Sequence, residues 1–354
     1  MQMGFHKSPH ALSVLVGAAV SVVVGGSPPA AEEPVQWKMA SAVSSSVVIL
    51  GTTAKGFTEK IAAISGGDFV IEFYEPGALV PPLEMFDAVS KGSIDAAWAP
   101  PGFWAGKIRA APLFSAMPFG PPAGEFLAWV YHGGGQELWR EILARHDIYS
   151  VFCSLEAPEA SGWFREEITS VDDLKGLKMR FLGLGALTMQ KLGVSTQLLP
   201  PADVYPALER GVIDATELSV PAVDLNLGFH NIAKHYYFPG WHQPATLVDL
   251  MINLPGWQEL SDTHRAQIEV ACRASIVDNL ALAEASQFKA LTELQAKGVQ
   301  LHRWPHEMLA AFEAAWQEVA AEQAAEDAEF KRAWDSLQAF RADYKIWKEL
   351  GYLE

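Results

Sequence analysis

The stretch "LVPPLEMFDAVSKGSIDAAW", which begins at Leu79, is nearly repeated by "LLPPADVYPALERGVIDATE", which begins at Leu198. Laid together without a gap, residues 79–96 and 198–215 are identical at eight of eighteen positions. The identical pairs are Leu79/Leu198, Pro81/Pro200, Pro82/Pro201, Ala88/Ala207, Gly92/Gly211, Ile94/Ile213, Asp95/Asp214 and Ala96/Ala215. We attribute a match of this length to a structural unit that the chain uses twice.

Each copy reads as a short helix followed by a buried strand. A Pro-Pro pair precedes the helical pattern, and a glycine follows a basic residue, as helix carboxyl ends prefer (Lys91-Gly92 and Arg210-Gly211). An apolar strand entered through Ile-Asp-Ala comes next. Such units are typical of α/β domains with buried strands. Two copies 119 residues apart indicate two domains of like construction, since solenoid repeats are shorter and more numerous.

The bulk composition agrees with two packed domains. The chain has 354 residues, half of them hydrophobic, which suits two domains of ordinary size and argues against disorder. Its formal net charge is −16 and it contains no run of Lys or Arg, so we expect no nucleic-acid partner.

The amino-terminal segment predicts a secretory signal peptide over residues 1–31. Lys7 precedes an apolar run of fourteen residues, Ala11 to Val24, which is short for a membrane span. Small residues follow, and we place cleavage near Ala30 or Ala31. No cysteine follows the run, so no lipid anchor is expected. The mature protein is expected to be soluble and periplasmic.

The remaining patterns define the predicted domains. "DIYSVFC" and "ATLVDLMINL" read as strands that cross between them, Ser170 with Asp173 reads as a helix amino-terminal cap, and the pattern becomes helical from about Ser261. We expect domain I at 32–153 plus about 245–285, domain II at 154–244, and a helical region at 286–354. Clefts between such domains bind small ligands.

Six strings carry a resemblance to one family over most of the chain, from Trp37 to Leu353. They are "EPGALVP", "FDAVSKGSIDAAWAPPGFWAGK", "PEASGWFREEI", "LKGLKMRFLGLG", "GVIDATE" and "AKHYYFPGWHQPATLVDLMIN". They resemble the DctP-type extracytoplasmic receptors of tripartite ATP-independent periplasmic (TRAP) transporters, above all the dimeric subgroup that binds 2-oxo acids such as pyruvate. The resemblance implies a two-domain, type II-like periplasmic-binding-protein fold with hinge-crossing strands and a long carboxyl-terminal helix.

The resemblance also implies a function. Such a receptor captures an organic acid with a bound cation, performs no chemistry and delivers its ligand to a membrane permease. Members of the subgroup pair through a swapped carboxyl-terminal helix, which implies a homodimer. An aromatic stripe at Phe330, Trp334, Tyr344 and Trp347 also favours self-association, although the same helix must pack in part on its own chain.

Arg180 is the first candidate site residue. It ends the strand "LKMR", where a guanidinium can hold a carboxylate with two hydrogen bonds, although a surface ion pair explains such a residue equally well. The family pattern favours ligand binding. By resemblance, Glu217, Gln243 and the backbone carbonyl of Leu218 bind a cation, and Glu159 is either a further ligand or a surface carboxylate.

Charge counting favours calcium over sodium for that cation. Glu159 and Glu217 with a monoanionic acid carry three negative charges, which a divalent ion and Arg180 neutralise. Trp104 and Phe103 are predicted cleft walls, with core packing the simpler explanation for Phe103. Relatives have a Tyr-rich string before "WAGK", and the loss of those hydroxyls predicts a ligand with a small or apolar tail.

Several alternatives remain open at this level. The receptor could take an aromatic or longer acid, walled by Trp98, Trp104 and Trp241. A secreted metal-dependent enzyme acting on an organic acid would need a general base or nucleophile, and no such motif is present. "KHYYFPGWHQ" lacks metal-site spacing and reads as hinge packing. Cys153 and Cys272 are either a disulfide or two buried thiols.

Overall fold

The computed structural model describes residues 1–4 and 34–352, and the chain divides after Glu33 into two units. Apart from its first four residues, the predicted signal peptide with its cleavage point near Ala30 lies outside the described residues. Within the described part of the chain, no helix is both long enough and apolar enough to cross a membrane.

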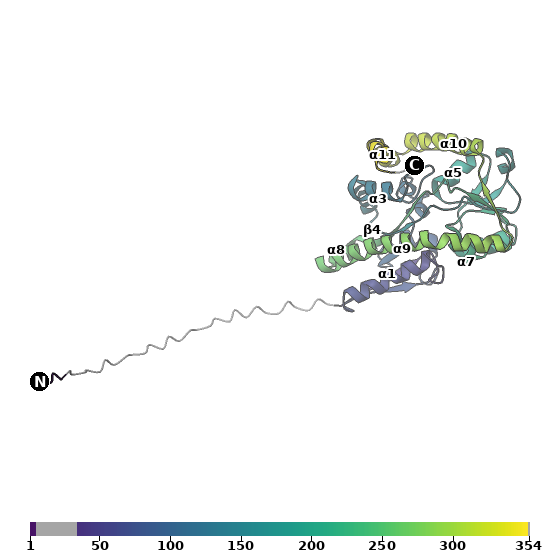
Figure 1. Cartoon of the computed structure of the whole chain (residues 1–354). Coiled ribbons are helices and arrows are strands. Elements are labelled where there is room, and N and C mark those ends of the chain that lie inside the picture. The colour runs from purple at the N-terminus through teal and green to yellow at the C-terminus, as the bar shows by residue number, and fades with distance from the viewer. Residues whose placement is uncertain (5–33, 353–354) are drawn as a thin grey trace. The chain divides into compact units, whose positions relative to one another are not determined.

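Two β-sheets organise the unit (Figure 1). The first sheet has the order β2-β1-β3-β10-β4 and the second the order β11-β9-β5-β8-β6-β7. Strands of the first sheet are β1 (Val35–Ser41), β2 (Phe69–Tyr74), β3 (Ala96–Ala99), β4 (Ile148–Glu156) and β10 (Thr246–Asn253). Strands of the second are β5 (Gly162–Phe164), β6 (Lys178–Arg180), β7 (Ser195–Gln197), β8 (Ala215–Thr216), β9 (His235–Phe238) and β11 (Gln300–Arg303).

Helices cover both sheets, as buried strands require. The α-helices are α1 (Leu50–Ile64), α2 (Met85–Ser90), α3 (Ala123–His132), α4 (Gly135–Ala144), α5 (Gly183–Lys191), α6 (Pro201–Glu209), α7 (Pro221–Leu227), α8 (Leu254–Glu259), α9 (Asp262–Ala296), α10 (His306–Glu326) and α11 (Ala328–Gly351). Short 3₁₀ segments include η1 (Pro82–Glu84) and η2 (Pro101–Trp104), and the predicted cap at Ser170 with Asp173 begins another, at Val171–Leu174. The predicted α/β class is confirmed.

The repeat in the sequence builds the same unit once in each sheet. In the first copy α2 leads through Gly92 into β3, and in the second α6 leads through Gly211 into β8. Both glycines have left-handed backbones, with φ of 67° and 70°. The Asp95 carboxylate accepts the Lys38 backbone N–H of β1 at 2.7 Å, and the Asp214 carboxylate accepts the Lys178 N–H of β6 at 3.0 Å. The repeated Asp thus ties its strand to a parallel neighbour in both sheets.

Two adjacent connections join the sheets. Strands β4 and β10 pair antiparallel in the first sheet, and residues 157–161 and 239–245 lead from them to β5 and β9 in the second. Two hydrogen bonds hold the connections together: the Glu159 N–H donates to the Gln243 carbonyl at 3.2 Å, and the Ser161 hydroxyl donates to the Pro239 carbonyl. A Cβ on Gly240 would lie 2.1 Å from the Glu159 carbonyl oxygen, so this approach requires glycine.

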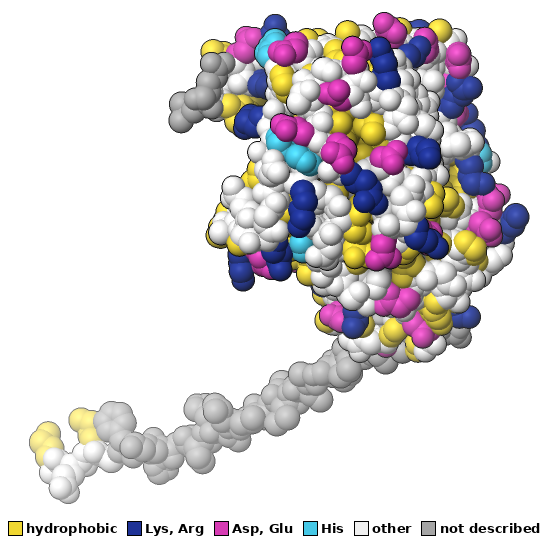
Figure 2. All heavy atoms as spheres, turned by 90° about the vertical axis from the view of Figure 1, so that its right-hand side faces the viewer, with side chains coloured by type: hydrophobic (Ala, Val, Ile, Leu, Met, Phe, Trp, Pro, Cys, Tyr) yellow, Lys and Arg dark blue, Asp and Glu magenta, His cyan; other side chains and the backbone are white. Residues whose placement is uncertain are grey.

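Long helices pack along two sides of the unit. Figure 1 shows α9 running along one side and α10 with α11 on the opposite side. Helix α9 contacts α1 beside the first sheet and α7 beside the second. Helix α11 lies on α3 and α4, where Arg341 pairs with the buried Glu125 at 2.9 Å and Arg332 with Glu141 at 3.0 Å. Figure 2 shows acidic and basic side chains interspersed over one face of the molecule.

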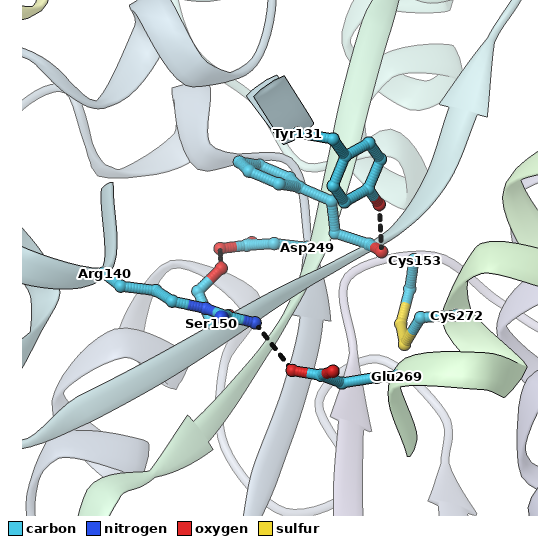
Figure 3. Close-up of a disulfide and its surroundings, with 8 residues drawn as sticks. Tyr131, Arg140, Ser150, Cys153, Asp249, Glu269 and Cys272 are labelled. Atoms are coloured by element: carbon cyan, nitrogen blue, oxygen red, sulfur yellow. Dashed lines mark hydrogen bonds and ion pairs between the residues drawn. A yellow bond between two sulfur atoms is a disulfide. The ribbon is translucent and has the colours of Figure 1, made fainter. Parts of the chain in front are cut away.

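The two cysteines form a disulfide between β4 and α9. Cys153 and Cys272, both fully buried, are bonded (Figure 3). Around it, the Arg140 side chain of α4 reaches Glu269 of α9 at 3.3 Å and the Ser150 carbonyl of β4 at 2.9 Å. The structure therefore selects the disulfide from the two alternatives that the sequence left open, and it places the bond away from the connections between the sheets.

Candidate functional site

A buried polar cluster lies where the two connections meet the second sheet. Gln243 donates from Nε2 to Glu159 Oε1 at 2.9 Å and to Thr246 Oγ1 at 2.7 Å, and the Thr246 hydroxyl lies 3.2 Å from the same Glu159 oxygen. All three side chains are almost fully buried. Because they come from different connections and from the start of β10, these bonds couple the sheets at the point where they join.

Arg180 and Glu217 form the other half of the cluster. Arg180 is the last residue of β6, and Glu217 directly follows β8. The two strands are adjacent and parallel, so the carboxyl ends of both strands meet at one edge of the second sheet. Arg180 Nη1 donates to Glu217 Oε1 and to the Glu217 carbonyl, each at 2.8 Å, and Nε donates to the Leu199 carbonyl at 3.3 Å. Glu217 Oε1 also accepts the Leu182 N–H at 2.6 Å. The pair is 2% and 0% exposed, so it is a buried ion pair.

The environment shifts the two carboxyl groups in opposite directions. Burial raises the pKa of Glu159, the nearby Glu217, Asp224 and Glu156 carboxyls raise it further, and the pKa lies well above its ordinary value. Burial also raises the pKa of Glu217, but the Arg180 guanidinium, His242 and the Leu182 amide outweigh that effect and the net pKa is lowered. The site therefore contains one stabilised carboxylate, Glu217, and one carboxyl group, Glu159, whose ionised form its surroundings disfavour.

Glu159, Arg180, Gln243 and Thr246 line a small cavity between the sheets. The cavity has a volume of about 50 Å³, which is room for a few waters or one small molecule. From the first-sheet side come Val43, Trp98, Phe103, Glu156, Thr246 and Val248, and from the connections and the second-sheet side come Glu159, Arg180, Leu218, Ser219 and Gln243. Burial raises the pKa of Glu156 to about 7.

Several oxygens at this cavity or directly beside it have no hydrogen-bond partner among the described residues. Among the described residues nothing bonds to Glu159 Oε2, Glu217 Oε2 or Gln243 Oε1. Glu159, Glu217 and His242 each offer a ligand atom within 4.8 Å of the others, and His242 Nε2 lies 3.6 Å from Glu217 Oε2. Buried oxygens without partners are costly, and a set rich in carboxylate and amide oxygens suits a hard cation. The residues present therefore fit a cation.

The structure brings four sequence candidates to the cavity together with Phe103. They are Arg180, Glu159, Leu218 and Gln243. Glu217 does not line the cavity and lies beside it, bonded to Arg180. Glu159 is 4% exposed, so it is not the surface carboxylate that the sequence left as an alternative. Trp104, which the sequence predicted as a cleft wall, does not line the cavity. Its ring packs behind the wall, with its centroid 5.6 Å from that of Phe86 and 6.1 Å from that of Phe103.

Sequence reasoning missed four residues at the cavity or beside it. Thr246, Ser219 and Glu156 carry no motif of their own, although each lies within three positions of a residue that was singled out. His242 was assigned to hinge packing, yet it lies beside Glu217. Its position directly before Gln243 was the one available signal.

Comparison with known proteins identifies the family of the chain. Residues 39–327 match the family described as bacterial extracellular solute-binding protein, family 7, also called DctP. A monocarboxylate 2-oxoacid-binding periplasmic protein of Nostoc sp. is 34% identical over 321 residues, which are 90% of this chain and 87% of that protein.

Solved structures of TRAP transporter solute-binding proteins show the same fold. One, from Bordetella bronchiseptica, has a TM-score of 0.88 and 32% identity over 90% of this chain and 95% of its own; it is a mixed-occupancy dimer with copurified calcium and picolinate. Another, from Pseudoalteromonas atlantica, has a TM-score of 0.86 and 31% identity over 91% and 100%, with bound sodium and pyruvate. This chain therefore belongs to the DctP family of extracellular solute-binding proteins and is a TRAP transporter solute receptor, not an enzyme.

Proposed function

We propose that this receptor binds a short 2-oxo or 2-hydroxy monocarboxylate, such as pyruvate, together with one cation. The observation that carries the proposal is the buried ion pair of Arg180 and Glu217 beside three carboxyl or amide oxygens that lack partners. The 2-oxoacid-binding relative and the pyruvate-bound structure support the same ligand class. The small volume of the cavity favours a short acid over a longer one.

In this proposal Arg180 binds the ligand carboxylate. Its Nε and Nη1 are engaged within the protein, and no described residue accepts a bond from Nη2. The Glu159 and Glu217 carboxylates, the Gln243 amide oxygen and the Leu218 carbonyl hold the cation. The cation supplies positive charge that lets the Glu159 carboxyl ionise and that binds the oxygens of the acid.

Calcium is our preferred cation, although sodium also occurs in a relative. Two ionised glutamates and one monoanion carry three negative charges, and Arg180 supplies one positive charge. Calcium brings the total to zero, whereas sodium leaves one negative charge buried among apolar walls. Copurified calcium in the Bordetella protein supports this choice.

The wider biology follows from the family. We propose that the chain is exported to the periplasm by cleavage within its first 31 residues and delivers its ligand to TRAP permease subunits. Domain I at 32–153 plus about 245–285 and domain II at 154–244 would close about the two connections. We also propose a homodimer through the region 286–354, since α11 ends in exposed apolar side chains. These are Ile346, Trp347, Leu350 and Tyr352.

A fluorescence titration tests the site. The mature protein is unfolded in chelator, refolded without ligand, and titrated with pyruvate with and without calcium, using Trp98 in the cavity wall as the reporter. We expect saturable binding that requires calcium, and Glu217→Gln should weaken it by about 10- to 100-fold. Glu209→Gln, at an exposed position of α6, is the matched control.

Each outcome is informative. Binding that is unaffected by calcium would retain the receptor and remove the divalent site. No response to pyruvate or to other short 2-oxo acids would overturn the ligand class. A monomeric mass by light scattering at micromolar concentration would overturn the homodimer.

A further inference from the structure

Glu156 presents an unexplained polar atom to the same cavity. It ends β4 on the first-sheet side, is 2% exposed, and lines the cavity. Its Oε1 accepts from Ser154 Oγ and from Asn279 Nδ2, each at 3.0 Å. Its Oε2 is buried and bonds to none of the described residues. One oxygen of this carboxyl is therefore fixed and the other is free to bind something in the cavity.

A second layer of contacts holds the carboxyl in place. Asn279 of α9 donates from Nδ2 to the Leu155 carbonyl at 3.1 Å as well as to Glu156, and its Oδ1 accepts the Thr53 hydroxyl of α1 at 2.5 Å. Thr53 and Asn279 are themselves buried. These contacts restrict the Glu156 side chain to one orientation. Groups that bind a ligand are held in this way, whereas solvent-exposed acids are not.

The neighbours of Glu156 on this side of the cavity are apolar. Val43, Leu50, Trp98 and Val248 line the wall with it. The other polar side chain there, Thr246, is already bonded to Glu159 and Gln243. A ligand tail without a polar group would leave Glu156 Oε2 buried and unpaired, which costs binding free energy.

We propose that Glu156 is a subsite for a hydroxyl group on the tail of the bound acid, so that the receptor prefers a short 2-oxo acid with a terminal hydroxyl to the same acid ending in methyl. The inference rests on the proposed function and narrows its ligand class. A hydroxyl donates to an ionised carboxylate and accepts from a protonated carboxyl, so it pairs with Glu156 in either form. A second carboxylate on the ligand would meet Glu156 and Glu159 as like charges and is disfavoured.

This subsite supplies a polar group that the segment after the first copy of the repeat lacks. The string "APPGFWAGK" carries no tyrosine hydroxyls, which predicted a small or apolar tail. The structure instead offers a polar partner from the end of β4, on the same side of the cavity as Trp98. A site built to bond a hydroxyl discriminates strongly against the analogue that lacks it.

Three acids of graded chemistry test the inference by calorimetry in the presence of calcium. They are pyruvate, 2-oxobutyrate and 3-hydroxypyruvate, of which the last two are nearly equal in size and differ in a methyl against a hydroxyl. We expect the wild-type chain to bind 3-hydroxypyruvate at least about tenfold more tightly than 2-oxobutyrate. Glu156→Leu should abolish that preference and retain pyruvate binding. Glu156→Gln should keep it, because an amide also donates and accepts.

The controls separate this inference from the proposed function. Glu166→Gln, at an exposed position, should leave all three affinities unchanged. Equal wild-type affinity for 2-oxobutyrate and 3-hydroxypyruvate, or an unchanged preference in Glu156→Leu, would overturn the subsite while pyruvate binding upheld the receptor. Failure of all three acids to bind the wild-type chain would overturn both. If Glu156→Leu does not fold, equal wild-type affinity for 2-oxobutyrate and 3-hydroxypyruvate would still overturn the subsite.

Discussion

The two copies of the repeat share a scaffold and differ at the site. In both, a helix, a left-handed glycine and an aspartate lead into a strand beside a parallel neighbour. When the registers of the two strand pairs are compared, Ala40 of the first sheet corresponds to Arg180 of the second. Trp98 corresponds to Glu217, which lies one residue beyond β8. Positions that hold the scaffold are thus alike, while these positions at the ends of the strands carry apolar groups in the first sheet and charges in the second.

The difference supports the proposed binding role of Arg180 and Glu217. An alanine at the position of Arg180 satisfies the same strand geometry in the first sheet, so the fold does not require an arginine there. A buried ion pair is weak evidence for stability, because desolvation offsets much of its attraction. The asymmetry therefore favours ligand binding as the reason for Arg180 and Glu217.

Removing Arg180 should have the largest effect. Arg180→Ala leaves Glu217 as an unpaired buried carboxylate, and we expect the free energy of unfolding to fall by about 3–5 kcal/mol and ligand binding to be lost. Arg180→Ala combined with Glu217→Gln should recover much of the stability but not the binding. Urea unfolding and calorimetry measure both quantities, with Arg210→Ala, on the exposed end of the repeat helix, as control. Binding by Arg180→Ala would contradict the assigned role.

A buried aspartate lies on each side of the unit, Asp249 in β10 of the first sheet and Asp224 in α7 beside the second. Asp249 accepts from Trp139 Nε1 and Ser150 Oγ, and Asp224 accepts from Trp163 Nε1 and Tyr236 OH, all within 2.9 Å. Burial raises the pKa of each to about 7. The folded state then holds protons that the unfolded state releases near pH 4, so this contribution is complete below about pH 4 and is lost as the pH rises through about 7.

Replacing either aspartate tests that sign. Asp249→Asn and Asp224→Asn should each flatten the fall in stability between about pH 4 and 7 and raise the free energy of unfolding at pH 8, on the order of 1 kcal/mol or more. Urea unfolding at several pH values between about 4 and 8 measures this pH dependence of the free energy of unfolding. A steeper fall in the variants would contradict the prediction. An effect from only one of them would show that the two halves differ in their buried acids as well as in their sites.

The repeated aspartates should give smaller and nearly equal effects. Asp95→Ala and Asp214→Ala each remove one carboxylate bond to a backbone N–H, and we expect each to lower the free energy of unfolding by about 1–2 kcal/mol. Only Asp214→Ala should also weaken ligand binding, because it loosens β6, which positions Arg180. A loss of affinity in Asp95→Ala of the same size would break the contrast between the copies.

The repeated glycines should give the smallest effects. Gly92→Ala and Gly211→Ala place a Cβ on a left-handed backbone, at a cost of about 1 kcal/mol each. A Cβ on Gly92 would lie 3.4 Å from Asn253 Nδ2, whereas nothing lies within 4 Å of one on Gly211. We therefore expect Gly92→Ala to cost at least as much as Gly211→Ala in thermal unfolding, and the reverse order would contradict this comparison.

Local pattern by itself determined much of the protein. The repeat, its glycines and the cap at Ser170 are encoded by neighbouring residues, because turns, caps and buried strands depend on sequence over a few positions. The same strings identified the family, and with it Arg180, Glu217 and Gln243 as candidates. Residues whose role follows from a motif were within reach of the sequence.

Only the tertiary structure decided which side chains share the cavity. Glu156 and Thr246 line the cavity with Arg180, and His242 lies 3.6 Å from Glu217, because two connections and two sheet edges converge there. The same holds for the bond between Cys153 and Cys272, which are 119 residues apart. Burial, which leaves Glu159 and Glu156 with unpaired oxygens, is a property of the packed molecule, since it depends on contacts between segments that the sequence keeps far apart.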